Sequence, residues 1–408
     1  MVCEDCKPEF DRLIKRIEIL ERRLAVYENA NTPSSKTRFP PRILNPNKNK
    51  PGQKEGHEGI TRQNQNPTMT LEVIENKCPD CKSKLGKPFK TTTKIVEEIP
   101  EPQPVKVTKF VNNIYLCRCC GKEVTARHKD CPDAGRFGIN VLAETALMKF
   151  EERLTFRKIQ AALERRWHLA VTPASVMEFT RRVCSALEAE HEKLIAKIRA
   201  SECVYADETS IRINGRNFWI WIFVAKGAAL CVIRKSRGKK VVKEILADYK
   251  GIVACDGWKS YAQFGYTIQR CWAHLLREAE NAESKKLYEL LCRLFADAKN
   301  GLARTHAEER LKTILSRRYK GEKSAKLIRK IRNGFGSWFT FLSHGYVEPT
   351  NNTAERALRE HVVIRKIIGG LRSLEGARVH ETIMSCLATW KLSGLNLFDM
   401  LVRFLRGS

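Results

Sequence analysis

The sequence predicts a multidomain α+β protein built around a mixed β-sheet, and three observations lead to this prediction. The chain has 408 residues, enough for two or three domains of about 150 residues each. Short apolar runs joined by Asn214 and Gly215 indicate antiparallel strands connected by a tight turn. Apolar residues at helical spacing dominate the chain on both sides of these runs. With 43% hydrophobic residues the chain can bury a sizeable core, which excludes disorder throughout.

The charge balance is strongly basic, with 74 Lys and Arg against 46 Asp and Glu and a formal net charge of +28. A field of this size attracts a polyanion, either nucleic acid or an anionic membrane surface, and exceeds what a small acidic substrate requires. No apolar run approaches the roughly 18 residues of a membrane span, and the first residues lack the apolar stretch of a signal peptide. We therefore expect a cytoplasmic protein that binds nucleic acid and no membrane.

Residues 1–30 predict an amphipathic helix, and residues 31–67 predict a linker. Apolar side chains recur in steps of three and four from Pro8 to Glu28. This stripe is short for a coiled coil, so the helix either pairs with a second copy of the chain or packs on its own chain. The linker is rich in Asn, Pro, Ser, Gly and Lys, a basic composition that suits either contact with DNA phosphates or a solvated tether.

Residues 68–135 carry two pairs of cysteines with metal-ligand spacing. Fifteen cysteines without a secretion signal indicate reduced thiols or metal ligands rather than a disulfide framework. Cys78 and Cys81 form one C-x2-C pair, and Cys117 and Cys120 form another. Two such pairs can close a tetrahedral shell of four thiolates around Zn²⁺. We therefore predict a zinc-binding ribbon that holds one structural zinc ion.

The ribbon should contain short β-strands, and its ligand set has one ambiguity. Runs rich in β-branched residues predict the strands Thr70–Ile74, Lys94–Ile99 and Val105–Leu116. Cys119 lies beside Cys120 and is an alternative fourth ligand. A third C-x2-C pair, Cys3 and Cys6, has no visible partner pair in the sequence.

Residues 136–200 change to a helical period. Three helices are expected, over Val141–Phe150, Arg157–Trp167 and Pro173–Ile198. Thr172 is a good N-cap, and Pro173 suits the first helical position. This arrangement suits a helix-turn-helix, in which the second helix enters the major groove of DNA, and an ordinary bundle with a solvated basic face is the alternative. The predicted DNA contacts are Arg157, Lys158, Arg181 and Arg182.

Residues 201–283 predict an α/β core. The expected elements are the strands Cys203–Asp207, Ser210–Ile213, Phe218–Val224 and Ala229–Arg234, the helix Lys239–Tyr249, and the strands Ile252–Cys255 and Tyr266–Cys271. The first strands form an antiparallel meander, and the helix returns the chain so that the later strands complete a mixed sheet. Three antiparallel strands, a helix and a further strand are the order of the ribonuclease H fold.

Carboxylates follow two of these strands. Asp207 is expected at the end of the first strand, and Asp256 directly follows Ile252–Cys255. Strands that end in Asp can fix carboxylates at an open edge, which suits a pair of metal ions, although an Asp that caps a turn is common. Glu355 falls in the first turn of a later helix, where the helix dipole alone would favour an acid.

Four motifs make the sequence recognisable: Asp-Glu-Thr from Asp207, Asp-Gly-Trp-Lys-Ser-Tyr from Asp256, Cys-Trp-Ala-His from Cys271, and Asn-Asn-Thr-Ala-Glu-Arg-Ala-Leu-Arg from Asn351. Together with the N-terminal helix, a Ser-Ser-Lys linker, the cysteine pairs and the helices in Glu381–Leu405, they resemble the transposases of the bacterial and archaeal insertion-sequence family numbered sixty-six. The resemblance covers nearly the whole chain.

This resemblance implies a DDE active site formed by Asp207, Asp256 and Glu355. These acids would hold two Mg²⁺ or Mn²⁺ ions, because adjacent carboxylates need cations to remain ionised together. The family's Cys-x2-His pattern falls on Cys271 and His274, where His274 is either an accessory active-site contact or a packed histidine.

The long interval between the second and third acids indicates an insertion into the core. Residues 284–345 are basic and helical in pattern, so we predict a helical insertion there. The catalytic core would then comprise residues 201–283 and 346–375, followed by C-terminal helices in residues 376–408.

The resemblance implies a transposase that binds the terminal inverted repeats of its element and catalyses metal-dependent strand cleavage and strand transfer. Its partners would be double-stranded DNA at the element ends and the target, further copies of the chain, and companion proteins of the element, in the nucleoid of a prokaryotic cell. Arg356 and Arg359 would hold phosphates or remain solvated helix charges. Two alternatives are a DNA-binding regulator with an inactive core and a structure-specific nuclease of the same fold.

Overall fold

The computed structural model describes residues 16–18, 20, 66–132, 135–257, 259–261 and 264–407. The chain divides into two units, Met1–Ile99 and Pro100–Ser408. Residues 16–18 and 20 are helical. The rest of the predicted N-terminal helix, most of the linker, and the pair Cys3 and Cys6 lie outside the described residues.

The described part of the first unit contains little regular structure. Within residues 66–99 a single bridge pairs Lys77 with Lys84 around the first cysteine pair. The predicted strands Thr70–Ile74 and Lys94–Ile99 are wrong, since these residues are exposed and form neither strand nor helix. β-Branched residues favour a strand only where a neighbouring strand and a buried face accept them.

A small hairpin flanks the second cysteine pair, near the start of the second unit. β1 (Ile114–Leu116) pairs antiparallel with β2 (Glu123–Thr125). The predicted strand Val105–Leu116 is therefore confined to its last 3 residues. All residues of both strands are exposed, so a hydrophobic core does not order this hairpin.

Three helices follow close to their predicted bounds: α2 (Ile139–Phe150), α3 (Phe156–Trp167) and α4 (Pro173–Arg199). Thr172 caps α4 as predicted, because its hydroxyl oxygen accepts the backbone N–H of Ser175 at 3.1 Å. α3 ends at His168, whose left-handed conformation, with φ of 50°, turns the chain toward α4.

These helices share one hydrophobic core with the C-terminal helices. α12 (Leu374–Leu392) and α13 (Leu397–Leu405) both contact α2 and α4. Buried members of this core include Leu142, Ile159, Val183, Ile383 and Trp390. The helices of residues 136–200 and 376–408 are thus packed together in a single body.

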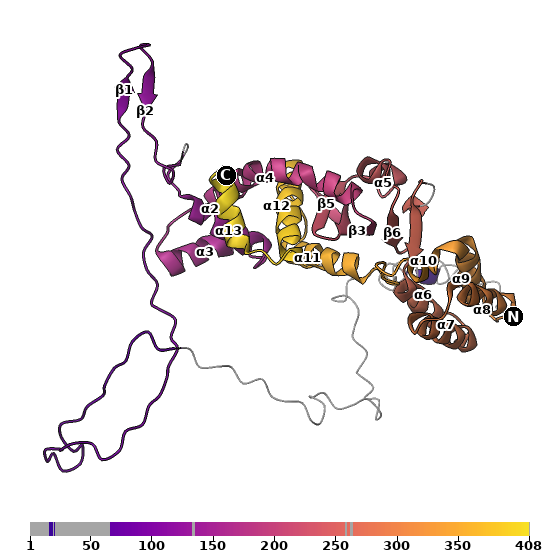
Figure 1. Cartoon of the computed structure of the whole chain (residues 1–408), viewed down its shortest axis with the longest axis horizontal. Helices are drawn as coiled ribbons and strands as arrows, with labels where there is room; N and C mark the ends of the chain where they lie inside the picture. Colours follow the sequence, from indigo (N-terminus) through magenta and orange to yellow (C-terminus); the bar gives the residue numbers. More distant parts are fainter. Residues whose placement is uncertain are drawn as a thin grey trace, which may run out of the picture. The chain divides into compact units, whose positions relative to one another are not determined.

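A mixed sheet of five strands lies in the middle of the second unit, in the order β5-β4-β3-β6-β7 (Figure 1). The strands are β3 (Cys203–Ile213), β4 (Arg216–Ala225), β5 (Ala228–Arg234), β6 (Ile252–Cys255) and β7 (Thr267–Arg270). β4 is antiparallel to both β3 and β5, whereas β6 is parallel to β3 and to β7. Asn214 and Gly215, with φ of 45° and 76°, form the tight turn between β3 and β4. The predicted mixed sheet is confirmed.

The first strand differs from its prediction in a way that matters for the site. β3 is continuous over 11 residues, so Asp207 lies within the strand rather than at its end. β4 pairs with β3 from Tyr205 to Ile213, but β6 pairs with β3 only from Cys203 to Tyr205. Asp207 therefore lies just beyond the point where β6 stops pairing.

Different helices cover the two faces of the sheet. Along β3, Tyr205 faces one core, whereas Val204 and Ala206 face the other. The first core includes α11 (Asn352–Ile368) and the helical insertion. The second core includes α5 (Lys239–Leu246) and the C-terminal half of α4.

The described chain between β7 and α11 is mostly helical, which confirms the prediction for residues 284–345. The helices are α6 (Trp272–Glu280), α7 (Lys285–Lys299), α8 (Arg304–Ser316), α9 (Glu322–Asn333) and α10 (Thr340–Ser343). They gather at one end of the second unit (Figure 1), where Trp272 and Trp338 meet edge to face at a centroid distance of 5.9 Å. Throughout the described ranges, the helices are too short or too polar to cross a membrane.

α12 covers the outer edge of the sheet. Ser385 Oγ accepts the backbone N–H of Cys231 at 2.9 Å, and Thr389 Oγ1 accepts that of Ala229 at 3.0 Å. These side chains satisfy backbone groups of β5 that would otherwise offer an unpaired strand edge.

Candidate active site

Asp207 and Asp256 lie beside each other on neighbouring strands. β6 pairs in parallel with β3, with Ala254 opposite Tyr205. Continuing this register by two residues places Asp256, which directly follows β6, opposite Asp207. Because side chains alternate along a strand, both carboxylates project from the face that Tyr205 and Ala254 line. The two predicted aspartates are thus brought together.

Glu355 comes from the first turn of α11, which packs on the same face of the sheet. Asn351, directly before the helix, is fully buried, and its Nδ2 donates to the main-chain oxygen of Ala206 at 2.8 Å. The main-chain oxygen of Asn351 accepts the backbone N–H of Glu355 at 3.1 Å. The start of α11 is therefore tied to the strand residue before Asp207, close enough for Glu355 to raise the pKa of Asp207.

The first turn of α6 faces the first turn of α11. Cys271 directly precedes α6, and its Sγ accepts the backbone N–H of Asn351 at 3.1 Å. One turn later, His274 Nδ1 lies 3.4 Å from Glu355 Oε1. Potential metal-ligating atoms of Cys271, His274 and Glu355 lie within 4.8 Å of one another. Of the two interpretations of His274, the structure thus places the side chain against a predicted active-site acid.

The acids repel one another strongly. Burial raises the pKa of Asp207 well above its usual range, and the carboxylates of Glu208, Asp256 and Glu355 raise it further. The backbone N–H of Glu208, which donates to Asp207 Oδ1 at 2.9 Å, opposes this rise only in part. A cation is the general means of keeping several buried carboxylates ionised together. The site therefore has the electrostatics of a cation-binding site.

Buried polar atoms that make no hydrogen bond lead to the same conclusion. Among the described residues, Glu355 Oε1, His274 Nδ1 and Asn351 Oδ1 are buried and make no hydrogen bond. Carboxylate and amide oxygens are the ligands that Mg²⁺ and Mn²⁺ prefer. The residues present therefore fit a divalent metal ion held mainly by oxygen atoms, with an imidazole nitrogen close by.

Glu208 follows Asp207 but projects from the opposite face of the sheet. Its side chain is 1% exposed, lies 2.9 Å from the Arg237 guanidinium, and accepts the Tyr261 hydroxyl at 2.7 Å. Burial and the charge of Asp256 raise the pKa of Glu208, whereas Tyr261 and Arg237 lower it. The strand pattern alone does not separate these two adjacent acids, and the assignment to Asp207 comes from the resemblance.

The first cysteine pair forms a compact turn within its own unit. The backbone N–H of Cys78 donates to the main-chain oxygen of Ser83 at 2.9 Å, and Lys82 adopts a left-handed conformation with φ of 60°. Hydrogen bonds with Ser83 lower the pKa of Cys81 to about 7. A thiol with this pKa is readily deprotonated to the thiolate that binds zinc.

The second cysteine pair forms a similar turn in the second unit. The backbone N–H of Gly121, which has φ of 67°, donates to the main-chain oxygen of Cys117 at 2.8 Å. Backbone N–H groups of Cys120 and Cys119 lower the pKa of the Cys117 thiol. The two turns thus share the features expected of metal-binding knuckles, each in its own unit.

The predicted DNA contacts of the helical segment have different surroundings. Arg157 and Lys158 are exposed on α3, and Arg182 is half-buried on α4. Arg181 forms ion pairs with two glutamates, the nearer of which is Glu375 at 2.7 Å. Arg157 and Lys158 are therefore better placed for a partner than Arg181.

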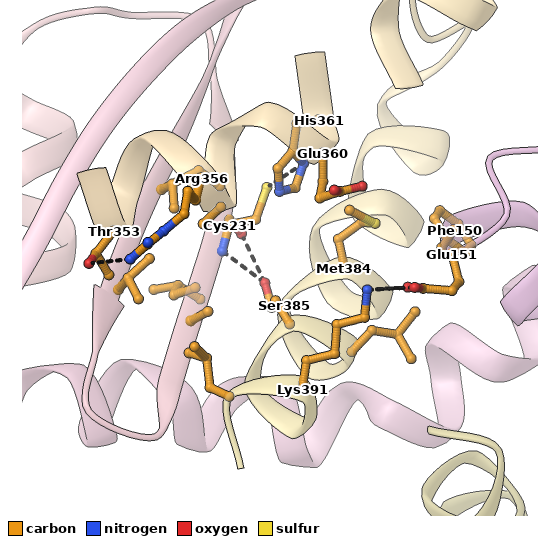
Figure 2. Close-up of a pocket in the computed structure, with 18 residues that line it drawn as sticks. Phe150, Glu151, Cys231, Thr353, Arg356, Glu360, His361, Met384, Ser385 and Lys391 are labelled. Carbon is orange, nitrogen blue, oxygen red and sulfur yellow. Dashed lines mark hydrogen bonds and ion pairs between the residues drawn. The ribbon is translucent and has the colours of Figure 1, made fainter. Parts of the chain in front are cut away.

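A pocket of about 270 Å³ lies between the sheet, α11 and α12 (Figure 2). Arg356, another predicted DNA contact, lines this pocket, and its guanidinium lies 3.4 Å from Thr353 Oγ1. Arg359 is exposed on the same helix. Arg356 therefore lies beside this pocket, whereas Arg359 lies one helical turn after Glu355 on the same side of α11.

A second group of potential metal ligands lines and borders the same pocket. Cys231 Sγ lies 3.7 Å from His361 Nδ1, which lies 2.8 Å from His380 Nε2 (Figure 2 labels the first two). Burial lowers the pKa of His361 well below its usual range and that of His380 to about 4. Both imidazoles are thus neutral at pH 7 and form a hydrogen-bonded pair in an apolar core.

Residues 134–379 match the family model described as the Transposase IS66 family, a match that spans well over half of the chain. The chain therefore belongs to this transposase family, as its motifs predicted. The matched range contains the whole sheet, the helical insertion and the three predicted acids. Transposases use divalent metal ions, which agrees with the cation-binding character of the site.

Three uncharacterized proteins of Sinorhizobium fredii (strain NBRC 101917 / NGR234) are similar to the chain. The protein y4jD is 22% identical over 399 residues, covering 83% of this chain and 77% of the relative. The protein y4qI is 24% identical over 311 residues, covering 64% of this chain and 58% of the relative. The protein y4hP is 24% identical over 388 residues, covering 79% of this chain and 69% of the relative. The chain thus matches less than two thirds of the length of y4qI.

Proposed function

We propose that this chain binds the terminal inverted repeats of its insertion element, cleaves the DNA there and transfers the freed strand to target DNA. The observation that carries the proposal is the convergence of Asp207, Asp256 and Glu355 on one face of the sheet. Membership of a transposase family supports the class of reaction. The clustered acids supply a place for its chemistry.

The strand order supports a ribonuclease H-like core. Three consecutive strands β3 to β5 in antiparallel array, the helix α5 and the parallel strand β6 follow the order expected of that fold. The proposed core comprises residues 201–283 and 346–375, and residues 284–345 are its helical insertion.

The chain's own residues position the acids. β3 and β6 fix Asp207 and Asp256 side by side, while Asn351 anchors the start of α11 and so places Glu355. His274 lies against Glu355 and restricts where its carboxylate points. Two Mg²⁺ or Mn²⁺ ions bound by the acids would offset their repulsion and supply Lewis-acid activation of the scissile phosphodiester.

The proposed reaction consists of two displacements at phosphorus. In the first, the oxygen of water bonds to phosphorus as the bond to the 3′ oxygen breaks, which leaves a 3′-hydroxyl and a 5′-phosphate. In the second, this 3′-hydroxyl attacks a target phosphodiester, and the target's own 3′ oxygen leaves. Neither step needs a protein nucleophile. Burial raises the pKa of the nearby Cys271 thiol, the opposite of what a nucleophilic cysteine requires.

Basic segments outside the core are the proposed DNA-binding parts. The net charge of +28 supports phosphate binding, and Arg157 and Lys158 are exposed on the first of two helices arranged as α3, turn and α4. Because an element has two ends, several copies of the chain are expected to act together on DNA. Companion proteins of the element and a location in the nucleoid belong to the same proposal.

We also propose that Cys78, Cys81, Cys117 and Cys120 hold one structural Zn²⁺. The two turns and the lowered pKa values of Cys81 and Cys117 support this ligand set. The described residues around the pairs are almost all exposed, so metal binding would supply folding energy that a hydrophobic core does not.

The test is a cleavage and joining assay on purified full-length protein. The substrate is a duplex that carries the terminal inverted repeat of the element around the gene, incubated with target DNA and Mg²⁺ or Mn²⁺. We expect nicking at the repeat end and a covalently joined product. Binding without cleavage would favour the inactive regulator, and cleavage without a joined product would favour the structure-specific nuclease.

A further inference from the structure

A cavity of about 490 Å³ opens beside Asp256, between the sheet and helix α9 of the insertion. Among the described residues that line it, Asp256 is the one carboxylate and five side chains are cationic. The cationic residues are Lys259, Arg270, Lys326, Arg329 and Lys330. A cavity with this charge, next to a proposed active-site acid, suits a polyanionic ligand.

Arg270 is held firmly in the wall of this cavity. It ends β7, its Nη1 donates to the main-chain oxygen of Lys330 at 3.2 Å, and its guanidinium lies 5.6 Å from the centre of the Trp338 ring. Gly334 makes room for it, because a Cβ at that position would overlap the guanidinium. The side chain is therefore fixed by the fold before any ligand arrives.

Arg270 also has an unused donor. Its Nε is buried and makes no hydrogen bond with the described residues. Burial lowers the pKa of Arg270, and the nearby charge of Asp256 opposes this effect. Buried donors without a partner are rare in folded proteins, and an arginine donor in a preformed slot is suited to an anionic oxygen.

Arg329 contributes an available charge from α9. On the same helix, Lys326 and Lys330 form ion pairs with Glu322 at 2.8 Å and Glu278 at 2.5 Å. Arg329 is exposed and forms neither an ion pair nor a hydrogen bond with any residue that the structure describes. Of the three basic residues that α9 presents to the cavity, it is the one that forms no ion-pair contact within the described residues, although its charge helps to lower the pKa of Glu322.

We propose that Arg270 and Arg329 bind phosphates of the DNA strand on either side of the scissile phosphate, so that α9 forms one wall of the DNA-binding cleft. This inference rests on the proposed function, because its ligand is the DNA that Asp256 would help to cleave. Arg270 takes one phosphate through its buried Nε, and Arg329 takes a neighbouring phosphate from the solvent side. Both are positioning residues that hold the backbone without reading the bases.

The first test measures the affinity of full-length Arg329→Gln protein for the end duplex, with Ca²⁺ as the divalent ion. We expect affinity to fall about tenfold, because one charge-assisted contact is lost. The slope of log affinity against log salt concentration should decrease in magnitude by about one. The matched control is Lys323→Gln, which makes the same charge change at an exposed position of α9 outside the cavity and should bind within about twofold of the wild type.

A second measurement identifies the contacted phosphate. Methylphosphonate linkages, each of which removes the charge of one phosphate, are placed singly on both sides of the cleavage position. Neutralising the phosphate that Arg329 contacts should weaken binding by the wild type and by Lys323→Gln. Neutralising that phosphate should not weaken binding by Arg329→Gln any further. This non-additivity between the phosphate and Arg329 would not arise if the role of Arg329 were purely structural.

Arg270 is tested with two variants because its side chain is packed. Arg270→Lys keeps the charge but lacks the Nε donor and should lose affinity while unfolding near the wild-type temperature. Arg270→Gln should lose more affinity, and its thermal unfolding shows whether the fold is retained. In the Arg270 variants, the phosphate whose neutralisation has no further effect on binding should differ from the one that Arg329 contacts.

Two outcomes separate this inference from the proposed function. Wild-type affinity and an unchanged methylphosphonate response in both Arg329→Gln and Arg270→Lys would overturn the inference and leave cleavage by the three acids intact. A wild-type protein that binds the end duplex, shows both couplings and yet never cuts it in Mg²⁺ or Mn²⁺ would instead support the inference and contradict the proposed function.

Discussion

His274 Nδ1 lies 3.4 Å from Glu355 Oε1, which joins the first turn of α6 to the first turn of α11. Cys271, three residues before His274, accepts the backbone N–H of Asn351 at the start of α11. Residues three apart at a helix start lie on one face, so the Cys-x2-His spacing lets one turn of α6 make both contacts. The two residues of the pattern thus both contact the start of the helix that carries the third predicted acid.

Neutralising the adjacent acids Asp207 and Glu208 should have different effects on stability. Asp207→Asn removes a buried charge that three other carboxylates repel, so the protein should unfold at the same temperature or a higher one in metal-free buffer. Glu208→Gln removes the buried charge that the Arg237 guanidinium and the Tyr261 hydroxyl contact, and should cost about 1–3 kcal/mol. Thermal unfolding in EDTA measures both changes.

The control for this pair is Glu202→Gln, an exposed acid just before β3, which should change stability by less than about 0.5 kcal/mol. DNA cleavage at a temperature where all variants are folded should be lost in Asp207→Asn and largely retained in Glu208→Gln. Equal destabilisation by the two substitutions would show that both acids are structural.

Purified protein should contain about one zinc per chain, because the two cysteine turns supply four thiolates. The double variant Cys78→Ser/Cys117→Ser should lose the zinc. Cys292→Ser changes a half-buried cysteine of α7 in the same way and should keep it. Elemental analysis measures the zinc content, and circular dichroism shows whether each protein is folded. A folded wild-type protein free of zinc would contradict the proposed zinc site.

The pair His361 and His380 should make the protein less stable in acid. Burial and the charge of the buried Lys149 together lower the pKa of His380 to about 4, whereas an unfolded histidine titrates near about 6.5. Between these values the unfolded state binds a proton that the folded state does not, so the free energy of unfolding falls as the pH falls. For His380 the loss should reach about 3 kcal/mol by pH 4.

Urea denaturation of the wild type and of His380→Gln between about pH 7 and pH 4 tests this sign. Glutamine can keep a hydrogen bond to His361 but does not titrate, so the variant should lose less stability over this range. Identical slopes for the two proteins would mean that His380 is protonated in the folded state or lies outside the core.

The sequence predicted those features of the fold that local chemistry determines. The turn at Asn214 and Gly215, the cap at Thr172 and the bounds of β6 are confirmed. The sequence predicts that the first strand, Cys203–Asp207, ends at its first acid. In the structure β3 continues through both acids, so their side chains project from opposite faces of the sheet. The Arg237 guanidinium contacts Glu208, whereas other carboxylates lie near Asp207.

Other features depend on tertiary contacts that no local pattern contains. The strands predicted in residues 70–74 and 94–99 do not form, because their β-branched residues have no partner strand. Asn351 contacts β3 only once α11 packs on the sheet. Arg270 of β7 contacts Lys330 only once α9 packs beside that strand. The motif around Glu355 placed that acid on the correct helix, but its approach to the aspartates depends on the sheet register.

The most direct test of the account compares cleavage and binding in one variant, Glu355→Gln. This change removes a charge from the proposed metal site and preserves side-chain size, so the rate of end cleavage in Mg²⁺ should fall by orders of magnitude. Affinity for the end duplex should change by less than about threefold, because phosphate contacts of basic residues supply most of it. Combining the change with Asp207→Asn and Asp256→Asn should reduce cleavage little further, as expected when residues act as a unit. A Glu355→Gln protein that cleaves at the wild-type rate would contradict the account and move the third acid elsewhere.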